Sequence, residues 1–61
     1  MIEMTEKRLR IINSALCAYI ARLESNRQAL DEDDPSFRQF TILIDEYTSL
    51  KEDIEILLLR Y

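Results

Sequence analysis

Apolar side chains recur in both halves of the chain with the alternating three- and four-residue spacing of a heptad repeat. In the first half the stripe comprises Leu9, Ile12, Leu16, Tyr19, Leu23, Asn26 and Leu30. In the second half it comprises Phe40, Leu43, Tyr47, Leu50, Ile54, Leu57 and Tyr61. Residues with this spacing share one side of an α-helix, and the strict alternation typical of a strand is nowhere sustained. The pattern predicts two amphipathic helices whose stripes pack together as in a coiled coil.

The break between the stripes is the segment LDEDDPSF (30–37), which holds the single proline of a chain without glycine. Proline is favoured as the first residue of a helix, and an aspartate directly before it is a good N-cap. We therefore expect Asp34 to cap a helix beginning at Pro35, and Thr5 to cap the first helix. The predicted fold is all-α: an antiparallel hairpin with helices over about 5–30 and 35–60, joined by the acidic turn 31–34.

One position in the first stripe, Asn26, is polar. A polar residue between packed helices can fix their register or the number of partners. In the alternative interpretation the helices separate toward the turn, and Asn26 is exposed to water.

Apolar residues also lie outside the two stripes, most densely in ALCAYIA (15–21) and ILLL (56–59). On a helical wheel of ~100° per residue, Ile11 and Ala18 fall opposite the first stripe. Three residues widen the second stripe (Phe37, Ile44 and Leu58) and three point away from it (Ile42, Ile56 and Leu59). A hairpin buries only one side of each helix, and contiguous exposed apolar surface usually marks an interface. We expect a second chain, a partner or another copy, to complete the fold there.

With 61 residues, the chain can build only a small core with a thin margin of stability. It has one cysteine, Cys17, and no histidine, so an internal disulfide and a zinc-type ligand set are excluded. Oligomerisation or a partner is the remaining source of stability. Cys17 is expected to be a small packing residue. A lone thiol, and the lack of a signal-peptide or membrane-span pattern, favour a cytoplasmic location.

Charge and side-chain chemistry favour an interaction protein over an enzyme. The net charge of −4 and the pI of about 4.6 disfavour nucleic-acid binding. Cys17 has no histidine to activate it, and a chain without glycine has no Gly-rich phosphate loop. Neighbouring acids such as Asp45 and Glu46 diverge by ~100° on a helix. No catalytic residue, cofactor or metal site is predicted.

The segment DPSFRQFTILIDEYTSLKEDIEILLLRY (34–61) resembles the second helix of the small type III secretion co-chaperones of the YscE/SsaE/EscE kind. The resemblance rests on the Asp-Pro turn, Phe37, the pattern Gln39-x-Thr41-x-Leu43, the pattern Ile54-x-Ile56 and the final Arg60-Tyr61. The first helix is similar to the family only in its heptad pattern.

Members of that family are cytoplasmic helical hairpins that pair with a larger tetratricopeptide-like chaperone, and the pair keeps a needle-forming subunit soluble before export. The resemblance implies that this chain is a non-enzymatic co-chaperone. It transfers interface positions only where the second-helix pattern matches, at Phe37, Thr41, Leu43, Ile54, Ile56 and Tyr61. With Ile11, Ala18, Ile42 and Leu59 from the helical wheel, these are the predicted partner-binding residues.

The alternative function is that of a homodimeric four-helix-bundle regulator that binds nucleic acid. Such a protein needs basic residues aligned on one exposed face. The bases of the first half are instead scattered around the predicted helix, at Lys7, Arg10, Arg22 and Arg27.

Overall fold

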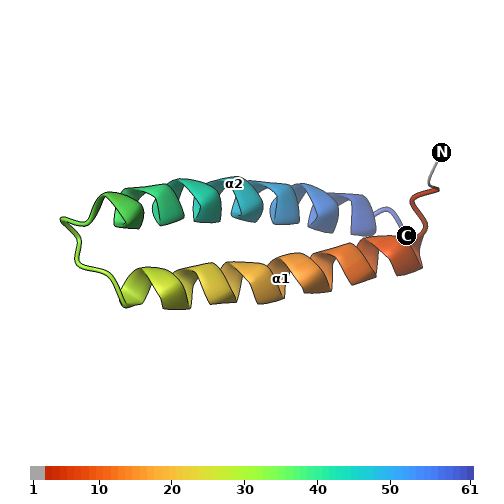
Figure 1. Cartoon of the computed structure of the whole chain (residues 1–61). Coiled ribbons are helices and arrows are strands. Elements are labelled where there is room, and N and C mark those ends of the chain that lie inside the picture. The colour runs from red at the N-terminus through yellow and green to blue at the C-terminus, as the bar shows by residue number, and fades with distance from the viewer. Residues whose placement is uncertain (1–2) are drawn as a thin grey trace.

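The computed structural model describes residues 3–61 and consists of two antiparallel helices lying side by side (Figure 1). Helix α1 spans Glu6–Gln28 and helix α2 spans Pro35–Leu58. The turn closes one end of the hairpin, and the start of α1 and the end of α2 lie at the other. The prediction of an all-α helical hairpin is confirmed. Each helix ends two residues before its predicted boundary.

Both helices begin at the caps that the sequence indicates. The Thr5 hydroxyl accepts a hydrogen bond from the Arg8 backbone N–H at 3.2 Å. The Asp34 carboxylate accepts one from the Ser36 N–H at 2.8 Å, and Pro35 is the first residue of α2. Each cap satisfies one of the backbone donors that a helix leaves unpaired at its N-terminus. Because capping depends only on residues close in sequence, these two boundaries follow from local chemistry.

A small set of side chains is buried between the helices. It consists of Leu9, Ile20 and Leu23 from α1 and Ile44 and Ile54 from α2. Around Ile20, Leu23 and Ile44 pack the partly buried Phe40, Leu43 and Tyr47. This cluster lies near the middle of the hairpin, where both helices contribute large apolar side chains.

The contact between the helices differs from the predicted one by a rotation of each helix about its axis. Leu50, predicted to lie in the contact, is 45% exposed, whereas Ile44, predicted only to widen the stripe, is 6% exposed. In α1, Ile20 is buried and Tyr19 is exposed. Residues adjacent in sequence differ by ~100° around a helix. Leu9, Leu23 and Ile54 of the predicted stripes are buried in the contact as expected, whereas Tyr19 and Leu50 lie outside it, and the prediction is wrong for those two positions.

Tyr19 lies outside the contact, whereas Tyr47 is partly buried and packs against the core. Packed helices lie only ~8–10 Å apart, which limits the bulk of the side chains that fit between them at one level. The Tyr19 hydroxyl also needs water or a polar partner. The slimmer Ile20 and Ile44 lie in the contact.

Candidate functional site

Two tyrosines mark one side of the hairpin at about the middle of its length. The rings of Tyr19 in α1 and Tyr47 in α2 pack edge to face, with centroids 5.1 Å apart and ring planes at 88°. Tyr19 is exposed and Tyr47 is half-buried. The pair lies across the joint between the helices at the surface, and it shows which side of α1 adjoins which side of α2.

The heptad spacing extends this contact into a surface that we call the tyrosine face. Leu43, Leu50 and Leu57 continue the stripe of Tyr47 along α2, and Ile12 precedes Tyr19 by one heptad along α1. Residues with this spacing share one side of a helix, so both stripes lie on the side of the tyrosine pair. The tyrosine face consists of Ile12, Tyr19, Leu43, Tyr47, Leu50 and Leu57, all exposed or half-buried.

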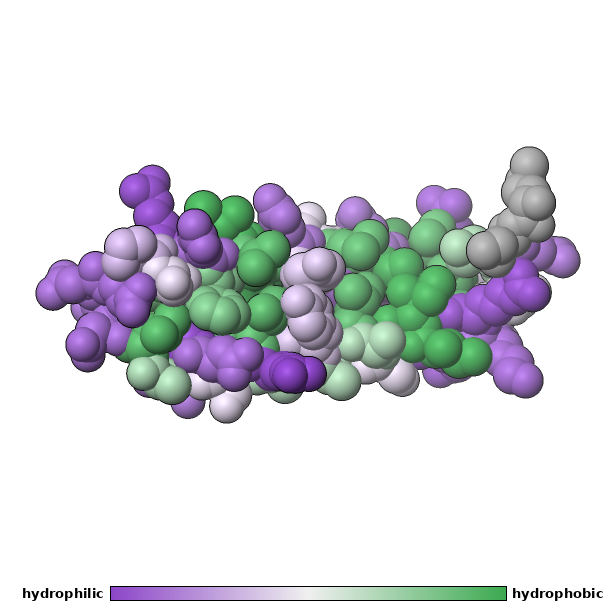
Figure 2. Space-filling model, viewed as in Figure 1, coloured by the Kyte–Doolittle hydropathy of each residue, from purple (hydrophilic) through white to green (hydrophobic). Residues whose placement is uncertain are grey.

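The hairpin exposes more surface than a compact monomer of its mass, and part of that surface is apolar. Figure 2, which views one side, shows hydrophobic side chains in a band along both helices, with hydrophilic side chains at the ends and margins. The accessible area is 5032 Å², whereas a folded monomer of 7.3 kDa is expected to expose about 4,200 Å². The excess, about 850 Å², is close to the area that one partner buries in a standard protein–protein interface.

The dimensions of the molecule explain that excess. The hairpin measures 43 × 22 × 14 Å, so it is a single layer of helices. Its radius of gyration is 14.0 Å, against about 10.5 Å for a compact chain of this length. Domains ordinarily bury their apolar faces between two packed layers. The tyrosine face has no second layer over it.

Most of the segment ALCAYIA (15–21) is likewise left exposed by the hairpin. Of its seven residues only Ile20 is buried, and Leu16 is half-buried. Ala15, Cys17, Ala18, Tyr19 and Ala21 are exposed. The hairpin itself therefore accounts for only part of this uncharged run. The prediction of Cys17 as a packing residue is wrong, because its side chain faces out beside the helix contact.

The side opposite the tyrosine face is mixed in character. A shallow depression there is lined by Cys17, Ile20, Ala21, Glu24, Thr48 and Lys51. Lys51 pairs with Glu55 one turn along α2, and a hydrogen bond to that carboxylate, with its charge, raises the pKa of Lys51 above 10.5. A thiol, a hydroxyl and an ion pair on one rim make this side polar. The two sides of the hairpin are thus chemically distinct.

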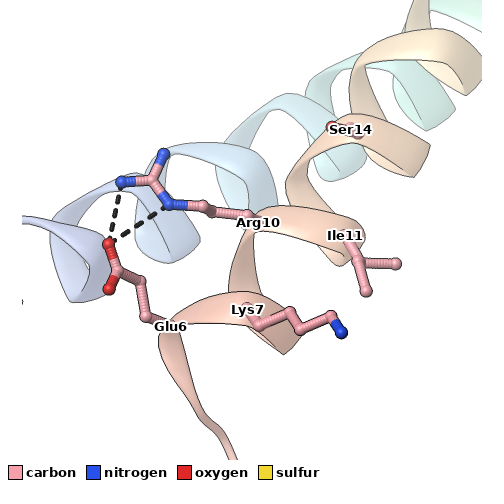
Figure 3. A pocket seen from close by; sticks show the side chains of 5 residues that line it. All are labelled: Glu6, Lys7, Arg10, Ile11 and Ser14. Carbon is pink, nitrogen blue, oxygen red and sulfur yellow. Dashed lines mark hydrogen bonds and ion pairs between the residues drawn. The ribbon is translucent and has the colours of Figure 1, made fainter.

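A second depression lies on the outer side of α1 and is formed by that helix alone (Figure 3). Arg10 folds back on Glu6, with its Nη2 2.9 Å and its Nε 3.3 Å from the same carboxylate oxygen. Lys7 and Ile11 extend away from this pair. The hollow is open and holds one exposed ion pair, with Ser14 also among the residues that line it.

The predicted partner-binding residues fall into three groups. Those on the outside of the hairpin or at its terminal end are exposed: Ile11, Ala18, Ile42, Ile56, Leu59 and Tyr61. Phe37, Thr41 and Leu43 are half-buried, and Ile54 is 8% exposed between the helices. The structure brings only Leu43 of this set onto the tyrosine face. The exposed members of the tyrosine face are Tyr19, Leu50 and Leu57. The heptad pattern assigned all three to the contact between the helices. The signal missed in the sequence is that Tyr19 and Tyr47 fall at the same level of the hairpin.

Phe37 and Thr41 are held by contacts within the hairpin. The Arg27 guanidinium lies 5.5 Å from the centre of the Phe37 ring and donates a hydrogen bond to the Thr41 hydroxyl at 3.2 Å. That hydroxyl donates in turn to the Phe37 carbonyl at 3.1 Å. These contacts attach the end of α1 to the start of α2 beside the turn.

Four of the eight basic residues are engaged in contacts within the hairpin. Arg10 pairs with Glu6, Lys51 pairs with Glu55, and Arg27 is occupied at Phe37 and Thr41. Arg8 donates to the backbone carbonyl of Glu3 at 2.9 Å. The arrangement gives no observation in favour of a nucleic-acid interface.

Comparison with models of known protein families, with curated proteins and with solved structures gave no significant match. The resemblance to type III secretion co-chaperones therefore stays a prediction. Within residues 3–61, no group of three or more histidine, cysteine, aspartate or glutamate side chains is placed to hold a metal ion. Neither described helix combines the length and apolar character of a membrane span.

Proposed function

We propose that the protein is a non-enzymatic interaction module that binds a larger helical protein through its tyrosine face. The proposal rests on the uncovered apolar stripe on one side of a single-layer hairpin. Leu50 and Leu57 expose much of their side chains there, and the tyrosine pair lies at mid-length. Burying such side chains contributes roughly 25 cal/mol per Å² of apolar area removed from water.

The partner that fits this face is a tetratricopeptide-like chaperone, and the proposed role is that of a cytoplasmic co-chaperone for a type III secretion needle subunit. Such a partner is built from stacked helix pairs with apolar grooves between them. A helical hairpin laid on those grooves packs helix against helix. The resemblance of residues 34–61 to the family supports this choice of partner.

The co-chaperone role follows from mass action. A protein that binds only the folded form of its partner stabilises that form, and the effect grows with its concentration above Kd. A partner with an exposed apolar groove gains solubility when the hairpin covers it. This role needs no catalytic group.

Co-purification with a tetratricopeptide-like chaperone from the same type III secretion system tests the proposal. The two proteins are expressed together, and the amount of hairpin retained on the tagged partner is measured. Leu50→Glu places a charge on the tyrosine face and is expected to reduce retention at least tenfold, because an unpaired charge is costly in a desolvated contact. Ile42→Glu is the matched control, since Ile42 is similarly exposed on the outer side of the same helix.

Two results would count against the proposal. If the wild-type chain is not retained by any such chaperone while its helicity is normal, the co-chaperone role is wrong. If Ile42→Glu abolishes retention and Leu50→Glu does not, the outer side of α2 is the binding surface, as the helical wheel first indicated.

A further inference from the structure

We infer that in the free protein the tyrosine face is covered by a second copy of this chain, packed so that the turn of each copy lies beside the terminal end of the other. The product is a four-helix bundle with a twofold axis across the long dimension of the hairpin. This inference does not depend on the proposed function, because it concerns the chain alone.

The total accessible area of the hairpin leaves room for one second copy. A standard interface buries about 800 Å² on each partner, and the hairpin exposes about 850 Å² more than a compact monomer of its mass. The hairpin is 43 Å long, and a second hairpin matches it in length. Stacking two single layers produces the two-layer arrangement by which domains normally bury their apolar faces.

The rotation of each helix relative to the predicted contact also supports a second copy of the chain on the tyrosine face. In a four-helix bundle, heptad positions point at the central axis of the bundle and not straight at the neighbouring helix. Among the heptad positions, Leu9, Leu23 and Ile54 are buried within the hairpin, whereas Tyr19 and Leu50 are turned out of its contact. The outward heptad positions are the part of the stripe that a bundle would bury and an isolated hairpin leaves exposed.

The distribution of charge selects the orientation. One end of the hairpin carries the acidic turn 31–34, and the flanking Arg27 and Arg38 leave that end net acidic. The other end carries four bases against three acids (Lys7, Arg8, Arg10 and Arg60 against Glu3, Glu6 and Glu55) and is net basic. Packing with the turns at opposite ends brings unlike charges together, whereas packing with the turns side by side brings two acidic segments together.

The position of the tyrosine pair suits this orientation. Tyr19 lies near the middle of Glu6–Gln28, and Tyr47 lies at the middle of Pro35–Leu58. A twofold axis across the centre places the pair of one copy against the pair of the other. It also sets Leu43 of one copy opposite Leu50 of the other, because the two lie on either side of Tyr47 at similar distances along α2.

The test combines the mass of the purified chain with one distance. Sedimentation equilibrium at tens of micromolar is expected to give a two-chain species. For the distance, Cys17→Ser and Glu32→Cys are combined, and a nitroxide spin label is attached in the exposed turn. Pulsed electron spin resonance is expected to give a turn-to-turn separation comparable with the 43 Å length of the hairpin. Turns packed side by side would give a separation within about 20 Å, because packed helices lie ~8–10 Å apart.

Paired variants locate the contact. Leu50→Glu is expected to convert the dimer to a monomer, and Ile42→Glu, of similar exposure on the outer side of α2, is expected to leave it a dimer. If Leu50→Glu also unfolds, the distance measured on the spin-labelled chain with an intact face still decides the orientation.

Three outcomes would overturn the inference: a 7.3 kDa monomer at these concentrations, a short turn-to-turn separation, or dissociation by Ile42→Glu with Leu50→Glu unaffected. The experiments distinguish failure of the dimer inference from failure of the proposed function. A dimer with the expected separation that binds no tetratricopeptide-like chaperone would refute only the function. A monomer that binds one would refute only the dimer.

Discussion

The ring of Tyr19 meets the ring of Tyr47 edge to face, at 5.1 Å between centroids, on the surface of the joint between α1 and α2. Edge-to-face pairs of this kind contribute about 0.5–1.5 kcal/mol beyond the area they bury. Tyr19 stays outside the contact between the helices, whereas Tyr47 is partly buried against Ile20, Leu23 and Ile44. The apolar side chains on either side of the pair along the helices form the tyrosine face.

Ile44 is expected to matter for the fold, and Leu50 for association. Ile44→Ala removes a buried side chain and is expected to cost about 2–5 kcal/mol, enough to abolish cooperative unfolding in so small a domain. Leu50→Ala removes a half-exposed side chain, so its effect on thermal unfolding is expected to depend on protein concentration. Circular dichroism melts over a hundredfold range of concentration distinguish the two. Equal, concentration-independent losses would show that Leu50 lies in the hairpin core after all.

Asn13 is a site where substitution should stabilise the protein. Its side-chain oxygen is buried without a hydrogen-bond partner among the described residues. Leaving such a group unsatisfied costs about 1–3 kcal/mol. Asn13→Leu, which is similar in size and apolar, is expected to raise the melting temperature. Gln28→Leu is the control, because it removes an exposed amide from the same helix. Equal melting temperatures for Asn13→Leu and the wild type would mean that water reaches this oxygen.

The Asp34 cap is expected to contribute to the start of α2. Asp34→Ala removes the acceptor of the Ser36 N–H and should lower stability by about 1 kcal/mol. Asp34→Asn keeps an acceptor and should lose much less. Asp33→Ala removes a neighbouring negative charge without touching the cap, and it serves as the control in chemical denaturation. If Asp33→Ala and Asp34→Ala behave alike, charge in the turn matters more than the cap.

The Lys51–Glu55 pair is expected to stabilise the protein at neutral pH and to lose this effect in alkali. The pKa of Lys51 is raised above 10.5 in the folded state by Glu55. The stabilisation is therefore fully present below pH 10.5 and disappears as the pH rises through the folded pKa. Titration of Lys51 followed by NMR should show its pKa fall in Glu55→Gln and stay in place in Glu46→Gln. An unchanged titration in Glu55→Gln would show that the pair does not persist in solution.

The sequence by itself determined the elements of this fold. Thr5 and Asp34 cap helices where predicted, Pro35 opens α2, and the segment around 31–34 turns the chain. Each of these features depends on hydrogen bonds and backbone restrictions between residues a few positions apart. The heptad stripes also identified which residues are apolar on each helix. Only the last two residues of each predicted helix were misplaced, where no glycine marks the end.

Only the tertiary structure decided which side of each helix faces the other. Ile44 is buried and Leu50 is exposed, Ile20 is buried and Tyr19 is exposed, and Cys17 faces out. A helix can turn about its axis without changing a single local hydrogen bond, and one residue of difference in the sequence is ~100° of rotation. The choice is made by the bulk of side chains that meet across the two helices. In this chain Ile20 and Ile44 fill the contact while Tyr19 and Leu50 face outward, which leaves the tyrosine face open to a second chain.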